Sequence, residues 1–515
     1  MKKFVLYLFF LICFIPKIFA IDVGQFFILT LPSDIKLEEI RSWLSQAKPA
    51  GVMLTSPHFS STDFTRQLTQ KLQDEARALN LPPLFIAVDW EGGIVSRPSE
   101  VGGFYSVPSP RNICLGTREL EMAGLAGALI GRQLSDVGVN MNFAPSLDLF
   151  APLNFILATR CFSDNPQTTA EFGIKFAESL KWQGVFPVVK HFPGLGLGKG
   201  DTHNQGVSIE FDLQNFTKHT FPFMKAIQAG IPFVMVSHAQ CSIFGGMPAT
   251  LSPEAVSWIR RINKNVLLIC DDFCMSGVKV DDSLPKTALK AILAGYNLII
   301  FSAPSDQQIK VIEELQSMVD SLDKVDEFAL LESVKMTNSF KEKNIPAASR
   351  IDFCVSQELA CKMLAESSIL FNKEVKIQKD SNLFLLTINL PLIRQAEQWF
   401  IQENLSYLAR KLSQNNQVQE FLFDPIQDFN GFEMPEIQEC DYFIVQTFFY
   451  GGGKWNDFQI KLLEKLRDVS NLIVVSLGHP LERAILEEKS DVAIFELGSF
   501  HIPLLNALAN KLTLN

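Results

Sequence analysis

Short apolar runs alternate with amphipathic stretches along residues 25–302 of this 515-residue chain. The apolar runs cover residues 26–31, 51–55, 84–89, 139–145, 185–191, 233–238, 266–271 and 297–302. The stretches between them, such as 38–46, 63–79 and 118–137, carry apolar residues at helical spacing. Eight strands that alternate with helices predict an α/β fold, in which parallel strands close into a (β/α)8 TIM barrel over residues 21–345.

The pattern changes after residue 343. Residues 346–355 contain Pro346, two alanines and Ser349, and we interpret them as a linker. Residues 356–515 contain fewer strand-like runs, at 383–388, 442–447, 472–476 and 492–495, separated by helical stretches. This spacing predicts a second, smaller domain, an α/β sandwich with a largely parallel sheet.

The N-terminal 20 residues have the layout of a secretory signal peptide. Lys2 and Lys3 precede an apolar run at residues 4–15, and Ala20 is a small residue at the expected cleavage site. We expect export to the periplasm or the extracellular space, with no stable membrane insertion after cleavage. A segment that stays uncleaved and anchors the chain is the alternative. A net charge of −10 argues against nucleic acid as a partner.

Polar residues interrupt the apolar runs at the ends of several predicted strands. They are Asp89, Asp148, Lys190 with His191, His238, and Asp271 with Asp272. Catalytic groups of (β/α)8 barrels lie at the C-terminal ends of the strands, where the βα loops converge. The sequence therefore predicts one polar site at that rim.

The most informative stretch is Lys190-His191-Phe192-Pro193-Gly194, followed by a glycine-rich run and then Asp201-Thr202-His203. An aspartate can hold an imidazole in one tautomer and keep it ready for proton transfer near neutral pH. Asp201 and His203 are thus candidates for a general acid/base pair. The whole string resembles the signature of the β-N-acetylhexosaminidase branch of glycoside hydrolase family 3.

Other motifs extend this resemblance over most of residues 21–345. In chain order they are Asp89-Trp90-Glu91-Gly92-Gly93 with Arg97 downstream, Gly138 to Pro145, Arg160-Cys161-Phe162, Pro248 to Ser252, and Asp271-Asp272-Phe273-Cys274-Met275. The resemblance implies that Asp271 is the nucleophile and that His203, oriented by Asp201, is the acid/base. It implies that five residues bind the substrate sugar: Asp89, Arg97, Arg160, Lys190 and His191. Asn140, Asp148 and Asp272 are expected to be structural, and His238 could either line the pocket or cap its strand.

The resemblance implies a retaining exo-β-N-acetylglucosaminidase that needs no metal or cofactor and acts on peptidoglycan fragments. Two departures from the family pattern stand out. Leu195 replaces a histidine beside the sugar-binding pair, and Trp90 replaces a residue that is usually polar, so we expect a different surface there. The alternatives are a β-N-acetylglucosaminide phosphorylase of the same fold and a non-catalytic module that binds cell walls. Nothing in the sequence predicts the oligomeric state.

Overall fold

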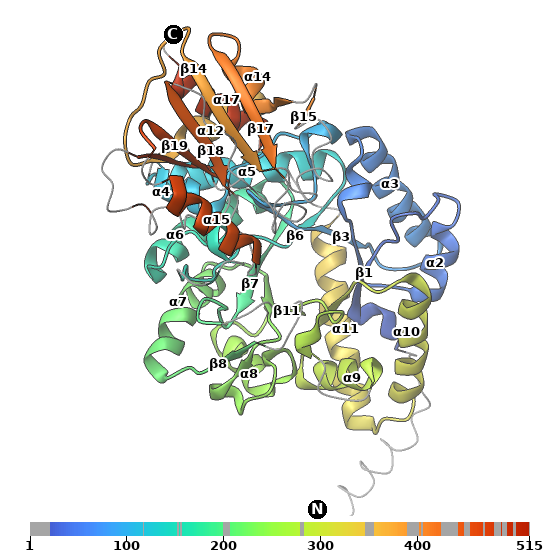
Figure 1. The fold of residues 1–515 in the computed structure, drawn as a ribbon. Coiled ribbons are helices and arrows are strands. Elements are labelled where there is room, and N and C mark those ends of the chain that lie inside the picture. The colour runs from blue at the N-terminus through green and yellow to red at the C-terminus, as the bar shows by residue number, and fades with distance from the viewer. Residues whose placement is uncertain are drawn as a thin grey trace, which may run out of the picture.

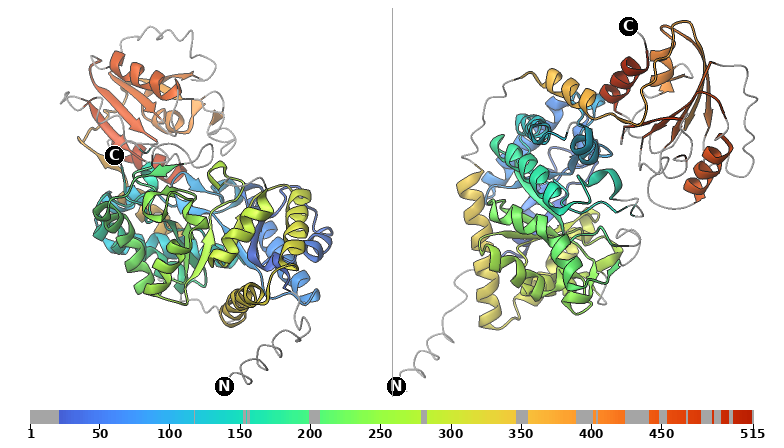
Figure 2. Two further views of the ribbon diagram at one scale, coloured as in Figure 1. Left: turned by 90° about the horizontal axis from the view of Figure 1, so that it is seen from below. Right: turned by 90° about the vertical axis from the view of Figure 1, so that its left-hand side faces the viewer.

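The computed structural model describes most of the chain. The described residues are 21–116, 118–151, 154, 157–198, 207–278, 283–345, 355–388, 401–402, 405–423, 441–447, 454–466, 469–477, 486, 492–497 and 501–513. The predicted signal peptide and nearly all of the predicted linker lie outside them. Two lobes are visible, a larger one built from the first part of the chain and a smaller one built from the last part (Figures 1 and 2).

The larger lobe is a closed barrel of eight parallel strands, as predicted. The barrel strands are β1 (Phe27–Thr30), β2 (Gly51–Met53), β3 (Phe85–Val88), β6 (Met141–Asn142), β7 (Phe186–Phe192), β9 (Phe233–Val236), β11 (Leu267–Cys270) and β12 (Leu298–Phe301). Their order around the barrel is the order along the chain, and β12 pairs with β1 to close the ring. Each of the eight predicted apolar runs is therefore a barrel strand.

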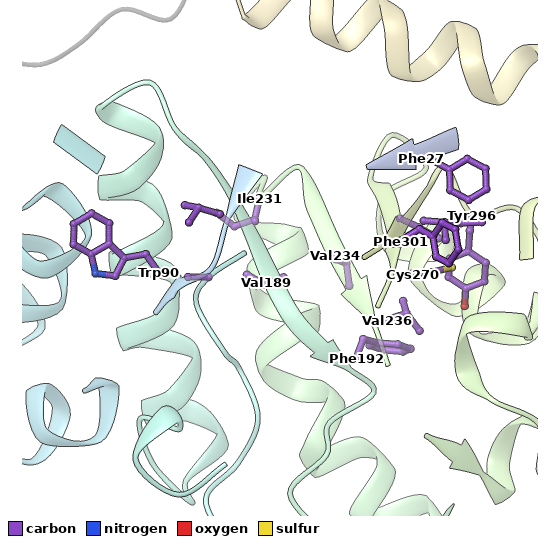
Figure 3. Close-up of a cluster of buried hydrophobic side chains, with 14 of the residues drawn as sticks. Phe27, Trp90, Val189, Phe192, Ile231, Val234, Val236, Cys270, Tyr296 and Phe301 are labelled. Atoms are coloured by element: carbon purple, nitrogen blue, oxygen red, sulfur yellow. The ribbon is translucent and has the colours of Figure 1, made fainter. Parts of the chain in front are cut away.

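Helices surround this barrel and cover its outer surface. They are α2 (Ile40–Ala47), α3 (Thr62–Ala78), α4 (Pro110–Gly116), α5 (Leu120–Asp136), α6 (Pro166–Trp182), α7 (Leu213–Gln228), α8 (Pro253–Ile262), α9 (Leu284–Ala294), α10 (Ser305–Val319) and α11 (Lys324–Asn344). Apolar side chains from strands and helices fill the layer between them, including Phe192 and Val236 (Figure 3). The ring of Phe192 lies 5.6 Å from that of Phe223 on α7, so strand β7 is fixed against its neighbouring helix.

The barrel interior is packed by a second apolar cluster and closed at its N-terminal end by α11. Phe85, Phe186 and Phe233 lie at the starts of their strands, and the ring of Phe340 on α11 lies 5.0–6.3 Å from all three. Because the N-terminal end is filled in this way, a pocket can open only toward the C-terminal ends of the strands.

The smaller lobe contains a six-stranded sheet with its own apolar core. Its strands, in spatial order, are β13 (Leu370–Phe371), β20 (Ala493–Glu496), β19 (Leu472–Ser476), β18 (Tyr442–Thr447), β14 (Asn382–Ile388) and β17 (Gln417–Phe423). Among these strand pairs only β13 and β20 are antiparallel. The helices of this lobe are α12 (Gln357–Ser367), α14 (Tyr407–Leu412), α15 (Lys454–Leu466) and α17 (Ile502–Leu512).

The pattern-based prediction was incomplete for this sheet. Four of its strands coincide with predicted runs, but β13 and β17 were not predicted. Strand β17 is an edge strand whose residues 417–422 alternate between exposed and half-buried, so it shows no continuous buried face. Within the described residues, no helix is both long and apolar enough to cross a membrane.

Candidate active site

A pocket of about 420 Å³ opens at the C-terminal ends of the barrel strands. Six of the eight predicted site residues line it: Asp89, Arg97, Arg160, Lys190, His191 and Asp271. The other two, Asp201 and His203, lie outside the described residues. The residues on either side of that segment, Gly198 and Val207, both line the pocket.

Lys190 is one of two buried cations of the site. It projects from β7, and its Nζ lies 2.8 Å from Oδ1 of Asp89 and 2.6 Å from Oε1 of Glu91. Burial by itself would lower the pKa of Lys190, but the two carboxylates outweigh burial and raise it. The ammonium group is therefore permanently charged and held in place for a ligand.

Glu91 joins Lys190 to a second cation, Arg160. The Nε and Nη2 atoms of Arg160 each donate to a different Glu91 oxygen at 2.8 Å, in the two-pronged geometry that guanidinium and carboxylate groups favour. Burial would raise the pKa of Glu91, but Arg160 and Lys190 together hold it well below its usual range. Glu91 is thus an ionised carboxylate that fixes two of the predicted sugar-binding side chains.

The importance of Glu91 was missed at the sequence level, although a signal existed. Side chains alternate across an extended chain, so Asp89 and Glu91 point to the same side and Trp90 points to the other. Trp90 is fully buried against Phe104, with their ring centroids 6.0 Å apart. The expectation that Trp90 would alter the neighbouring surface was therefore wrong, because its side chain lies in the core.

His191 is held in one tautomer by its neighbours. Its Nδ1 lies 2.6 Å from Oδ2 of Asp148, and its Nε2 lies 3.3 Å from Nη2 of Arg160. A carboxylate only accepts and a guanidinium only donates, so Nδ1 carries the proton and Nε2 is the acceptor. The ring is consequently oriented with Nε2 toward the pocket residues.

Asp148 has the supporting role that the sequence suggested. Besides His191, its carboxylate accepts a bond of 2.7 Å from the backbone N–H of Leu195. Burial would raise the pKa of Asp148, but these donors lower it. The residue thereby connects β7 to the glycine-rich run, whose Leu195 side chain lines the pocket where the family has a histidine.

Asp271 lies at the end of β11 and is half-buried in the pocket wall. Its Oδ1 accepts the backbone N–H of Asp272 at 2.9 Å. The Asp272 carboxylate accepts from the backbone N–H of Ser302 at 3.1 Å and from its hydroxyl group. Asp272 therefore braces the loop that carries Asp271.

His238 has a structural position. It is fully buried, with Nδ1 2.8 Å from the Thr250 hydroxyl and Nε2 2.9 Å from the Asp272 carbonyl oxygen. Burial lowers the pKa of His238, which favours the neutral ring. Of the two expectations left open, the structure favours capping of the strand.

Cationic hydrogen-bond donors and anionic acceptors both line this pocket. Three cations, Arg97, Arg160 and Lys190, line it together with four carboxylates, Asp89, Glu91, Asp271 and Asp272. Such a nearly balanced set suits a neutral ligand rich in hydroxyl groups better than a highly charged one. Within the described part of the chain, no cluster of three or more His, Cys, Asp or Glu side chains is arranged to hold a metal ion.

Comparison with known proteins agrees with this chemistry. Residues 22–336 match the family model described as "Glycosyl hydrolase family 3 N terminal domain". A β-hexosaminidase of Nitrosomonas eutropha is 30% identical over 302 residues, which are 56% of this chain and 83% of that protein. The β-hexosaminidase LpqI of Mycobacterium tuberculosis is 36% identical over 181 residues, 35% of this chain and 46% of the relative.

Solved structures resemble the whole two-lobed chain. A family 3 β-N-acetylglucosaminidase from Paenibacillus sp. has a TM-score of 0.80 at 21% identity, and 95% of each chain is covered. The β-glucoside phosphorylase BglX has a TM-score of 0.73 at 17% identity, covering 99% of this chain and 94% of that one. These likenesses show a shared fold. The family match and the 30% identity to a β-hexosaminidase covered over 83% of its length show that the chain belongs to glycosyl hydrolase family 3, in its β-N-acetylhexosaminidase branch, and is a glycoside hydrolase acting on O-glycosyl bonds.

Proposed function

We propose that the protein is an exported, retaining exo-β-N-acetylglucosaminidase that removes terminal β-linked N-acetylglucosamine from peptidoglycan fragments. The observation that carries the proposal is the gathering of Asp271 and five candidate sugar-binding side chains around one pocket of about 420 Å³. The packed barrel interior closes the floor of this pocket, which suits binding of a terminal sugar. The signal-like pattern of residues 1–20 supports export.

In the proposed first step, a carboxylate oxygen of Asp271 attacks the anomeric carbon. The bond from that carbon to the leaving oxygen breaks, and His203, oriented by Asp201, gives the leaving oxygen a proton. A covalent glycosyl-enzyme results. The neutral His203 then takes a proton from water, whose oxygen attacks the anomeric carbon and releases Asp271, so that two inversions give net retention.

The remaining side chains would bind the sugar ring. Lys190 and Arg160 donate to hydroxyl groups and Asp89 accepts from them, while His191, whose Nε2 lone pair accepts from Arg160, lines the same wall and holds that guanidinium in place. Because Glu91 and Asp148 fix these groups before the ligand arrives, little reorganisation is needed as the ring flattens in the transition state. Arg97, whose Nη2 lies 3.8 Å from Oδ2 of Asp89, would complete the contacts on this side of the sugar.

The test is hydrolysis of 4-methylumbelliferyl N-acetyl-β-glucosaminide at pH 6 to 7 in phosphate-free buffer. We expect turnover that is lost in Asp271→Ala and strongly reduced in His203→Ala. NMR should detect β-N-acetylglucosamine as the first-formed sugar. A preference for plain glucosides would contradict the proposed specificity. Release of a sugar 1-phosphate when phosphate is added would instead assign a phosphorylase.

The natural substrate requires a separate assay. Purified muropeptides with a terminal β-linked N-acetylglucosamine should release that sugar, whereas chains whose terminal sugar is blocked should not. Chitin oligosaccharides cleaved with much higher kcat/KM than muropeptides would argue against the peptidoglycan assignment without affecting the proposed chemistry.

A further inference from the structure

A short hairpin of the barrel lobe forms part of the pocket wall. It consists of β4 (Trp90–Gly92) and β5 (Val95–Ser96), directly after Asp89. The backbone N–H of Arg97 donates to the Asp89 carbonyl oxygen at 3.2 Å, which closes the base of the hairpin. Ile94, Val95 and Arg97 all line the pocket. The position of this hairpin therefore affects the shape of the sugar-binding side.

The tip of the hairpin is held from the smaller lobe. His501, the residue just before α17, is buried, and its Nε2 lies 2.9 Å from the carbonyl oxygen of Gly93. A carbonyl oxygen only accepts, so Nε2 carries the proton and donates. Its Nδ1 faces Oε2 of Glu100 at 3.7 Å. The contact thus links the two lobes at the pocket wall.

A second contact acts on the same tip. Ile94 packs against the apolar core of the smaller lobe while its side chain also lines the pocket. Gly93 adopts a φ of +63°, and a Cβ added there would lie 2.6 Å from the Cβ of Ser109. The tip therefore lies between the barrel loop at Ser109 and the smaller lobe, and His501 supplies the hydrogen bond that holds it on the side of the smaller lobe.

From these contacts we propose that His501 is a positioning residue for substrate binding, and that the smaller lobe contributes to the active site by holding the hairpin 90–97 through this side chain. The inference rests on the proposed function for the identity of the sugar. The claim that His501 holds the hairpin does not depend on which sugar is bound. When the donor is lost, the hairpin tip gains freedom and Ile94, Val95 and Arg97 no longer meet the ligand in one arrangement, so ground-state binding weakens first.

The sharpest test compares His501→Gln with His501→Met, because the two new side chains are of similar length. The Gln amide nitrogen can reach the position of Nε2 and donate to the Gly93 carbonyl oxygen, whereas the Met side chain fills similar space without a donor. We expect His501→Met to raise KM for the 4-methylumbelliferyl substrate about five-fold or more, with kcat changed less than about two-fold. His501→Gln should restore KM to within about two-fold of the wild type.

Two further measurements separate positioning from general damage. Cys361→Ala removes a thiol that donates to the Ser106 carbonyl oxygen elsewhere on the interface between the lobes, and it should leave KM unchanged. Hydrogen exchange of the amides of Gly93 and Arg97, which are bonded to Val107 and Asp89, should be faster in His501→Met than in His501→Gln or Cys361→Ala.

Each outcome bears on the inference. Equal KM values and equal exchange in the Gln and Met variants would overturn it, and so would a similar rise of KM in Cys361→Ala. If the wild type fails to hydrolyse the substrate, the proposed function fails. The exchange measurement still decides whether His501 holds the hairpin, because it requires no activity.

Discussion

The guanidinium group of Arg160 and the carboxylate of Glu91 form a two-pronged ion pair, with both N–O distances at 2.8 Å, in the buried wall of the pocket. Glu91 bonds Lys190 on its other side, at 2.6 Å. One carboxylate therefore sets the positions of two cations that come from different parts of the barrel rim.

Glu91→Gln should reduce kcat/KM by at least about 100-fold. The amide cannot neutralise two buried cations, so Arg160 and Lys190 lose the carboxylate that fixes them for the ligand. Steady-state kinetics tests this. Glu75→Gln is the matched control, because Glu75, on α3 and outside the pocket lining, also joins an arginine and a lysine, Arg41 on α2 and Lys71 on α3. Equal losses in both variants would contradict a role specific to the site.

Asp148→Asn should impair activity through His191. The carboxylate accepts from Nδ1 of His191 and from the N–H of Leu195, and an amide can satisfy only one of them without facing a donor. We expect a loss in kcat/KM of about 100-fold or more. Asp323→Asn, which alters an acceptor of two backbone N–H groups at the start of α11, should have no effect on activity.

The same variant has a predictable pH dependence of stability. The folded-state pKa of Asp148 is lowered, so the native carboxylate adds stability above its unfolded pKa of about 3.9, and this is lost as the pH falls through the folded value. The deficit of Asp148→Asn in the free energy of unfolding should therefore be largest at neutral pH and shrink below about pH 4. Urea unfolding at several pH values measures this deficit. A deficit that does not shrink at low pH would contradict the expectation.

Asp271→Asn and Asp272→Asn should differ sharply. The first replaces the proposed nucleophile and should lower kcat by about 1,000-fold or more. The second keeps an oxygen for the backbone N–H groups of Cys274 and Ser302, and the Ser302 hydroxyl can rotate to accept from the new amide. We expect less than about ten-fold loss for Asp272→Asn. A loss as large as that of Asp271→Asn would reassign Asp272 to the chemistry.

Lys341→Met should stabilise the protein. Lys341 is fully buried at the closed end of the barrel, where its Nζ lies 3.2 Å from Oε1 of Gln25, and burial lowers its pKa to about 7. In the unfolded chain the pKa of this lysine is about 10.4. Below pH 7 the lysine is charged in both states, and the cost of burying the charge destabilises the fold most there. As the pH rises to about 10 the unfolded chain also loses the proton, so the destabilisation fades. The penalty is of the order of 4 kcal/mol before the lost contacts are subtracted.

Thermal unfolding at pH 6, 8 and 10 tests this expectation. The gain in Tm from Lys341→Met should be largest at pH 6 and should have nearly vanished at pH 10. Lys343→Met, on an exposed position of the same helix, should change Tm little at any of these pH values. A gain independent of pH would mean that the buried charge is not its cause.

The barrel and most of the pocket were predictable from the sequence because their signals are local. Buried parallel strands form continuous apolar runs, and polar residues at the ends of those runs mark the rim. Asp89, Lys190 and Asp271 were found in this way. Asp201 and His203 remain predictions, because they lie outside the described residues.

The parts that were missed lack such signals. Strand β17 pairs on one side only and alternates in exposure, so its pattern resembles that of a surface segment. In the sequence Glu91 appeared only as one residue of a motif. Its ion-pair partners, Arg160 and Lys190, lie 69 and 99 positions further along the chain. The contact of His501 with Gly93 has no local pattern, because three-dimensional packing alone brings these residues together.

The contact between Gly93 and His501 joins positions 408 residues apart, and this has a consequence for synthesis. At about 5–20 residues per second, a ribosome takes roughly 20–80 s to proceed from one position to the other. During that time the barrel strands can already pair, but the hairpin beside Asp89 has no anchor from the second lobe. A nascent chain would thus acquire its barrel first and the final shape of its sugar pocket only after α17 has emerged and docked.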